Sequence, residues 1–249
     1  MSKNGNKTVG ELALEDPGLI HVFDNLGIDY CCAGGKSLEE ACAAANVPMD
    51  ELLRAVDQEE ILGKHDNPAA RYWQREPLFG IIEHILHKHH HFVRRELVHL
   101  DALFAKTCSA HGSAYPELLS MQGLFRELSQ ELLSHMAHEE QVLFPYITEL
   151  EERLSRQQAL APPHLKTLSA VRAMMQEHEL AGSKLAEIRE LSCNYSVPAH
   201  ACAAWRSLYA LLREFERDLH HHVHLENNLL FPRALEMERA ALRRCTVAM

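Results

Sequence analysis

Histidine is the residue type that offers the most chemistry in this chain, which carries 18 of them among 249 residues. Imidazole is the commonest protein metal ligand, so this number favours a metal site. The segment 135–145 is repeated as the segment 222–232, and in each a histidine is followed four residues later by a glutamate and nine residues later by Phe-Pro. The two pairs are His135 with Glu139, and His222 with Glu226. Side chains four residues apart lie on one face of a helix, so each pair can chelate a metal ion.

Two further histidines extend this repeat. His90 and His178 are 88 residues apart, close to the 87 residues that separate the repeated pairs. Apolar residues flank the first pair at helical spacing, and we expect these to face the core: Leu128, Leu132 and Val142. His90 and His178 share similar apolar stripes, so they too are expected to point inward. His89 and His91 remain alternatives to His90 within the same histidine-rich stretch.

The six side chains suit a pair of metal ions. In an antiparallel bundle, residues equidistant from a connecting loop are level, and the midpoints between successive ligands fall close to three predicted loops. Four imidazoles and two carboxylates exceed what one tetrahedral ion needs, and carboxylates can bridge two ions. Ligands of nitrogen and oxygen without thiolate favour iron, with manganese as an alternative. We therefore predict two Fe ions in a non-haem di-iron centre, against the competing interpretation of structural histidines without metal.

Glu131 and Asp218 each precede a repeated histidine by one helical turn. A histidine that binds a metal commonly donates its other N–H group to a carboxylate. We expect these two acids to accept such hydrogen bonds beside the metal ligands.

Adjacent cysteines form a second candidate site near the N-terminus. Cys31 and Cys32 stand in a loop rich in glycine, where both thiols can be exposed. Adjacent cysteines make a poor tetrahedral zinc site by themselves. They can pair transiently, hold iron briefly, react with nitric oxide, or simply pack. We expect them to act as a thiol or iron relay.

The arrangement of helices needed to position these residues is readable along the chain. Residues 1–63 are expected to form a small helical domain, with capping boxes at Thr8 and Ser37, and residues 64–77 a linker. Three breaks near residues 111–116, 158–163 and 193–198 divide the segment 78–236 into four long helices. Short loops favour antiparallel neighbours, so the predicted fold is all-α, an up-down-up-down four-helix bundle with a small N-terminal domain. Residues 237–249 form a C-terminal extension.

Composition excludes several classes of protein. The formal net charge is −10 and no block of Lys and Arg occurs, so nucleic acid is not an expected partner. No apolar run is long enough to cross a membrane, and the polar N-terminus lacks the apolar core of a signal peptide. Seven irregularly spaced cysteines favour reduced thiols over a disulfide framework. We therefore expect a cytoplasmic protein.

With these residues in place, the chain resembles the bacterial RIC (repair of iron centres) family, of the YtfE/ScdA type, over nearly its whole length. The resemblance is carried by Asp29-Tyr30-Cys31-Cys32 and by the segments 134–145 and 222–233. It implies a hemerythrin-like bundle, with iron ligands at His90, His135, Glu139, His178, His222 and Glu226. Ala33, inserted between Cys32 and Gly34, departs from the Cys-Cys-Gly-Gly sequence expected of the family.

The resemblance also implies a function in iron-sulfur cluster repair. Damaged iron-sulfur proteins are then the expected partners, and the di-iron centre supplies iron after oxidative or nitrosative stress. One alternative is an enzyme that reduces nitric oxide to nitrous oxide at the di-iron centre, and another is a sensor that binds oxygen or nitric oxide without catalysis. These residues are compatible with an enzyme as well as with a non-enzymatic protein, and with a homodimer.

Overall fold

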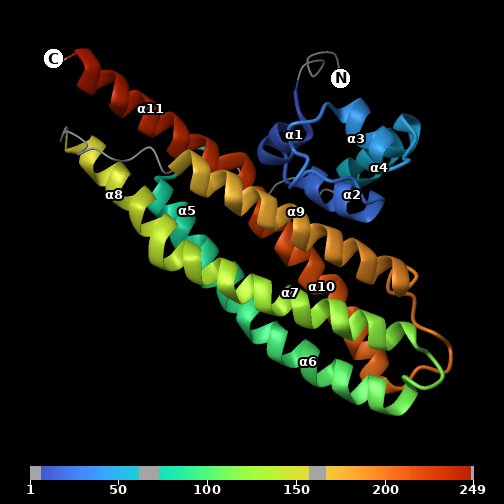
Figure 1. Ribbon diagram of the computed structural model, residues 1–249. Coiled ribbons are helices and arrows are strands. Elements are labelled where there is room, and N and C mark those ends of the chain that lie inside the picture. The colour runs from blue at the N-terminus through green and yellow to red at the C-terminus, as the bar shows by residue number, and fades with distance from the viewer. Residues whose placement is uncertain (1–6, 62–72, 157–166, 248–249) are drawn as a thin grey trace. The chain divides into compact units, whose positions relative to one another are not determined.

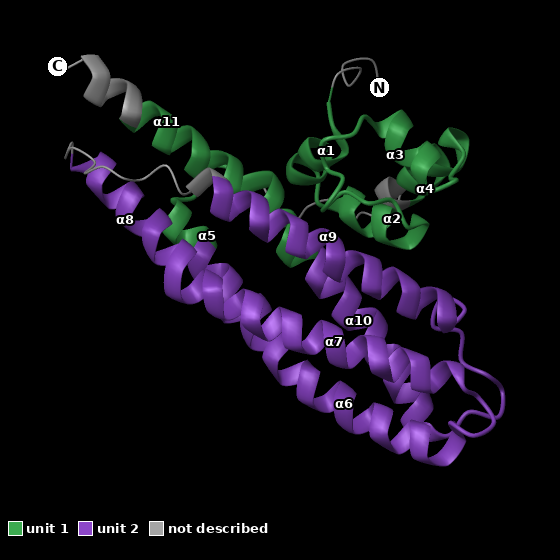
Figure 2. Ribbon diagram, viewed as in Figure 1, with its two compact units in different colours: residues 1–81, 221–249 green, residues 82–220 purple. Residues whose placement is uncertain are grey.

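The computed structural model describes residues 7–61, 73–156 and 167–247 of the chain, and these residues are helical with no β-strand among them (Figure 1). They divide into two compact units, one made of Met1–Ile81 with His221–Met249 and the other of Ile82–His220 (Figure 2). No helix in the described ranges combines the length and the low polarity needed to cross a lipid bilayer. The all-α class predicted from the sequence is confirmed.

The unit Ile82–His220 is built on four long helices. They are α6 (His91–His111), α7 (Glu117–His138), α9 (Thr167–Leu191) and the part of α10 (Ala203–Leu225) that ends at residue 220. α7 packs along both α6 and α9, and these helices lie side by side in Figure 1. The connection between α6 and α7 lies within the predicted break at 111–116. The predicted break at 158–163 lies outside the described residues.

The turn between α9 and α10 explains the break predicted at 193–198. Cys193, Asn194 and Tyr195 all have positive φ angles, between 49° and 58°, a conformation that no helix can continue through. Tyr195 is buried there and donates a hydrogen bond from its hydroxyl to Glu216 of α10 across 2.9 Å. The turn is therefore fixed to the helix that follows it.

Apolar residues at spacings of three and four fill the interior of this unit. Phe125 of α7 lies between aromatic rings on two other helices, 5.1 Å from the ring of Phe104 and 6.3 Å from the ring of Phe215. Phe104, Phe125 and Phe215 are fully buried. α6, α7 and α10 thus share an apolar core within this unit.

The other unit combines short N-terminal helices with the end of the chain. It contains α1 (Val9–Glu15), α2 (Gly18–Leu26), α3 (Leu38–Ala44), α4 (Met49–Ile61) and α11 (Phe231–Val247). Thr8 and Ser37 form the predicted capping boxes, with Glu11 and Glu40 respectively. Gly27 ends α2 with a φ of 68°, which glycine adopts without strain.

Among the described residues, three π-helical turns interrupt the helices, and each lies in a stretch that contains predicted metal ligands; α9, which carries His178, has none. They are η2 (Ile85–His90) after α5 (Leu78–His84), η3 (Glu139–Leu143) before α8 (Phe144–Ser155), and η4 (Glu226–Leu230) before α11. Pro145 and Pro232 follow η3 and η4, where the sequence predicts a local break because proline lacks an N–H group. α8 begins at Phe144 and α11 at Phe231, each one residue before its proline.

The π turn at η3 corrects one expectation about the core. Val142, expected on the inward stripe, is 54% exposed, whereas Leu143 is 2% exposed. A π turn holds more residues than an α turn, so the residues after Glu139 are rotated by about one position. Leu143 therefore takes the inward position that regular helical spacing gave to Val142.

The predicted domain boundaries are not fixed by this division into units. Residues 62–72, most of the predicted linker, lie outside the described residues, and α11 runs from Phe231 through the start of the predicted extension at residue 237. The boundaries at 63, 77 and 236 stay predictions.

Candidate metal centre

Within the unit Ile82–His220, four predicted ligands converge. His90, His135, Glu139 and His178 are each at most 4% exposed. Glu139 lies between two histidines, with Oε1 3.2 Å from His135 Nε2 and Oε2 3.4 Å from His90 Nε2. His178 Nε2 lies 3.0 Å from His135 Nε2. The ligand atoms of His135, Glu139 and His178 all lie within 4.8 Å of one another.

Two of these histidines are oriented by carboxylates at their other ring nitrogen. His90 Nδ1 lies 2.7 Å from Glu140 Oε1, and His135 Nδ1 lies 2.6 Å from Glu177 Oε2. We infer that each Nδ1 carries the proton and donates it to the carboxylate, so that each Nε2 presents a lone pair toward Glu139. This is the tautomer in which Nε2 can bind a metal ion.

Glu140 is held in place from a second side. Arg94 donates from Nη1 to the same Glu140 oxygen that faces His90, across 2.8 Å. Burial raises the pKa of the Glu140 carboxyl, but the hydrogen bonds from Arg94 and His90 outweigh this effect and bring the pKa below its usual value. Glu140 is therefore a carboxylate at neutral pH, as an acceptor for an imidazole N–H must be.

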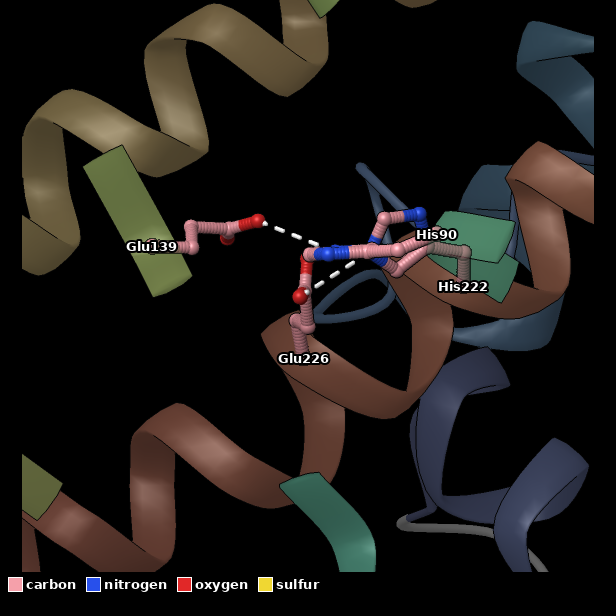
Figure 3. A group of neighbouring side chains, drawn as sticks. All are labelled: His90, Glu139, His222 and Glu226. Carbon is pink, nitrogen blue, oxygen red and sulfur yellow. Dashed lines mark hydrogen bonds and ion pairs between the residues drawn. The ribbon is translucent and has the colours of Figure 1, made fainter. Parts of the chain in front are cut away.

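The remaining two predicted ligands lie in the other unit. His222, near the end of α10, is 2% exposed, and Glu226, the first residue of η4, is 0% exposed. His222 Nε2 lies 3.0 Å from Glu226 Oε1. Figure 3 draws His222 and Glu226 together with His90 and Glu139. Its dashed lines mark the ion pair of His222 with Glu226 and that of His90 with Glu139. The predicted spacing of four residues thus does bring each histidine to its glutamate.

The π turns coincide with the ligands. His90 is the last residue of η2, Glu139 the first of η3 and Glu226 the first of η4. A π turn replaces the i→i+4 bonds of the helix with wider ones, costs stability, and recurs at functional sites. The segments at His90, Glu139 and Glu226 therefore depart locally from the most stable helical geometry, whereas His178 lies in the regular α-helix α9.

The donor set fits a metal of the iron and manganese class. Burying an ionised carboxylate without compensation is costly, and both Glu139 and Glu226 are fully buried. Their surroundings supply imidazole nitrogens and no thiolate, a combination that suits iron or manganese and disfavours copper(I). The predicted identity of these ligands is consistent with the burial and distances of the side chains.

Glu131 and Asp218, the predicted acceptors beside the ligands, have other partners. Glu131 is bound to Lys184 Nζ at 2.6 Å, and Glu177 takes the place at His135 that the sequence assigned to Glu131. Asp218 Oδ1 lies 3.0 Å from Nδ1 of His89, a buried histidine that precedes His90. The only sequence signal for Glu177 is its position next to His178. Glu140 has a similar signal, its position next to Glu139.

A cavity of about 210 Å³ opens beside His135. It is lined by residues of α7, among them Leu132 and His135, and by residues of α9, among them Glu177 and Ala181. A small ligand in this cavity would lie against the imidazole of His135 and its supporting carboxylate.

The two cysteines lie together in the loop after α2. Cys31 is 4% exposed and Cys32 is partly exposed, and their sulfur atoms are 3.9 Å apart. The hydrogen bond to Cys32, burial, and the charge of Asp29 together raise the pKa of the Cys31 thiol well above its usual value. Unless a cation binds to it, Cys31 is therefore a neutral thiol at physiological pH.

Comparison with known proteins places this geometry in a family. A model of the hemerythrin HHE cation binding domain matches residues 81–234, and the ScdA N-terminal domain, described as a domain of unknown function, matches residues 5–60. The chain is 34% identical to the iron-sulfur cluster repair protein YtfE of Yersinia pseudotuberculosis serotype IB (strain PB1/+), over 94% of this chain and 98% of the relative. The YtfE protein of Yersinia pestis (strain Pestoides F) is similar to the same extent.

The chain belongs to the YtfE family. The match to the hemerythrin HHE cation binding domain, over residues 81–234, covers all six predicted ligands. The bundle therefore belongs to the hemerythrin-like class, and the resemblance seen in the sequence is confirmed.

Proposed function

We propose that this protein repairs iron-sulfur clusters damaged by oxidative or nitrosative stress, in the cytoplasm, by supplying iron to damaged iron-sulfur proteins. The observation that carries the proposal is Glu139, fully buried between His90 and His135, each of which is backed by a carboxylate. Relatives that match nearly the whole chain are named iron-sulfur cluster repair proteins, which supports the same role.

We further propose that two iron ions bind at a single centre formed by His90, His135, Glu139, His178, His222 and Glu226. The repeat of 87 residues and the single cation-binding domain match over residues 81–234 support one shared centre. When bound, the iron pair supplies exchangeable ferrous ions and open coordination positions. The carboxylates beside His90 and His135 keep these imidazoles in the metal-binding tautomer, and the buried surroundings exclude water.

The experiment for repair uses an iron-sulfur enzyme inactivated by nitric oxide. The iron-loaded protein is added in the presence of a chelator that removes free iron, and recovery of the enzyme's cluster is followed by electron paramagnetic resonance. Recovery with the wild type, and none with His135→Ala, is expected. Equal recovery with both proteins would refute iron supply from this centre.

Cys31 and Cys32 are proposed to relay iron or sulfur chemistry to the client. Changing both to alanine is expected to slow repair while leaving the iron content of the bundle unchanged. Unchanged repair would remove these thiols from the function.

The cavity beside His135 favours a second candidate function, the reduction of nitric oxide to nitrous oxide. It would admit a diatomic molecule next to the proposed centre. Release of nitrous oxide over many turnovers, with an electron donor present, is the result that this alternative requires. Tight reversible binding of nitric oxide or oxygen, with neither nitrous oxide nor repair, would instead indicate a sensor.

A further inference from the structure

The loop after α2 brings together three side chains that can bind a metal ion. A carboxylate oxygen of Asp29 and the sulfur atoms of Cys31 and Cys32 all lie within 4.8 Å of one another. This group belongs to the unit that contains α1 to α4, and it shares no residue with the ligands described above. It is therefore a candidate for a separate site.

The backbone of this loop is fixed by Asp29 itself. Asp29 Oδ1 accepts hydrogen bonds from the backbone N–H groups of Cys31, Cys32 and Ala33, at 3.1, 2.9 and 3.2 Å. Oδ2 takes part in none of these bonds. Oδ1 also accepts a hydrogen bond from Cys31 Sγ across 3.4 Å, so the carboxylate that shapes the loop lies directly beside a thiol, where it can contribute an oxygen to a cation.

Two asparagines of η4 bind the backbone of the same loop. Asn227 donates from Nδ2 to the carbonyl of Cys31 across 3.2 Å, and Asn228 donates from Nδ2 to the carbonyls of Tyr30 and Cys31 across 3.1 and 3.3 Å. The Tyr30 side chain is 1% exposed. The positions of both cysteines are therefore set before any ion binds, which lowers the entropy cost of binding.

The separation of the two sulfur atoms fits one shared ion. Two thiolates about 2.3 Å from a tetrahedral ion are about 3.8 Å apart. The sulfur atoms of Cys31 and Cys32 are 3.9 Å apart. Adjacent cysteines alone supply too few donors for a stable site, but Asp29 adds a third.

We propose that Asp29, Cys31 and Cys32 form a second cation site, which binds one thiophilic divalent ion. The identification of that ion as ferrous iron rests on the proposed function. Both cysteines bind as thiolates, and their two protons pass to solvent. Asp29 is exposed and Cys32 partly exposed, so the fourth position is open to a donor from another protein.

Cobalt(II) provides the test, because thiolate-to-cobalt charge transfer absorbs in the near ultraviolet and the proposed bundle ligands include no thiolate. Cobalt(II) is titrated without oxygen into the reduced, iron-loaded full-length protein. One cobalt per chain with a charge-transfer band is expected. Absence of the band in the wild type would overturn the proposal.

Variants assign the band to individual ligands. Cys32→Ser is expected to abolish it, and so is Cys31→Ser, while Cys202→Ser is the matched control that keeps it. Asp29→Asn retains the amide oxygen that holds the backbone but loses a negative charge, so cobalt should bind about tenfold more weakly or worse. A band that persists in Cys32→Ser, or unchanged affinity in Asp29→Asn, would contradict the three-ligand site.

Two controls make these results interpretable. Circular dichroism of each variant checks the helical fold, and Cys32 is partly exposed, so its replacement tests the site even if the buried Cys31 does not tolerate change. The titration needs no client protein. Failure of cluster repair would therefore leave the cobalt result standing, and loss of the cobalt band would leave the bundle iron untouched.

Discussion

Asn228 of η4 lies against Gly34 of the cysteine loop so closely that a Cβ atom on Gly34 would come within 2.3 Å of Asn228 Oδ1. The same Cβ would lie 2.8 Å from the backbone oxygen of Tyr30. Asn228 follows Glu226, a proposed iron ligand, by two residues. The loop that carries Cys31 and Cys32 is thus joined by direct contacts to the segment that carries one end of the proposed centre.

Gly34→Ala is expected to lower the free energy of unfolding by about 1–3 kcal/mol, because the new methyl group overlaps a backbone oxygen that cannot move away cheaply. Gly35→Ala is the matched control, since a Cβ there meets nothing within 4 Å. Urea unfolding followed by circular dichroism measures both. Equal stability of the two variants would show that the loop does not lie this close to Asn228.

The π turn after Glu139 can be tested by a pair of neighbouring truncations. Leu143→Ala is expected to cost about 2–5 kcal/mol, because Leu143 is 2% exposed and its removal leaves a cavity. Val142→Ala should change stability by about 0.5 kcal/mol or less, because Val142 is 54% exposed. The opposite order of effects would indicate a regular α-helix through this segment.

Glu140→Gln is expected to lower the affinity of the protein for iron, because it weakens the hydrogen bond that keeps His90 in its metal-binding tautomer. Loss of such outer partners typically costs about 10–100-fold in metal affinity. The rate of iron transfer to a strong ferrous chelator measures the effect. Glu149→Gln serves as the control, since Glu149 forms an exposed pair with Arg153. If the two variants released iron at the wild-type rate, Glu140 would have no role in holding His90.

Much of the proposed centre could be predicted because its signals are local. The spacing of His135 to Glu139 and of His222 to Glu226 places each pair on one helical face whatever the rest of the chain does. Thr8 and Ser37 likewise cap helices through residues three positions away. Such interactions depend on the neighbouring sequence alone.

The features that sequence reasoning missed depend on geometry outside that range. A π turn shifts the inward face by about one residue. A helical pattern with a period of 3.6 does not contain that shift, so it predicts Val142 on the inward face. Glu177 reaches His135 from another helix, 42 residues away along the chain. Asn227 reaches Cys31 across 196 residues.

The iron content of the fully loaded chain decides whether a pair of ions binds. We expect two iron atoms per chain by elemental analysis, with Mössbauer spectra in which nitrogen and oxygen donors surround both. Glu139→Ala, which removes the carboxylate that faces both His90 and His135, should lose at least as much affinity as loss of an outer partner, about 10–100-fold. A wild-type chain that holds no more than one metal ion when saturated, or a Glu139→Ala chain that binds both ions with wild-type affinity, would contradict the di-iron centre.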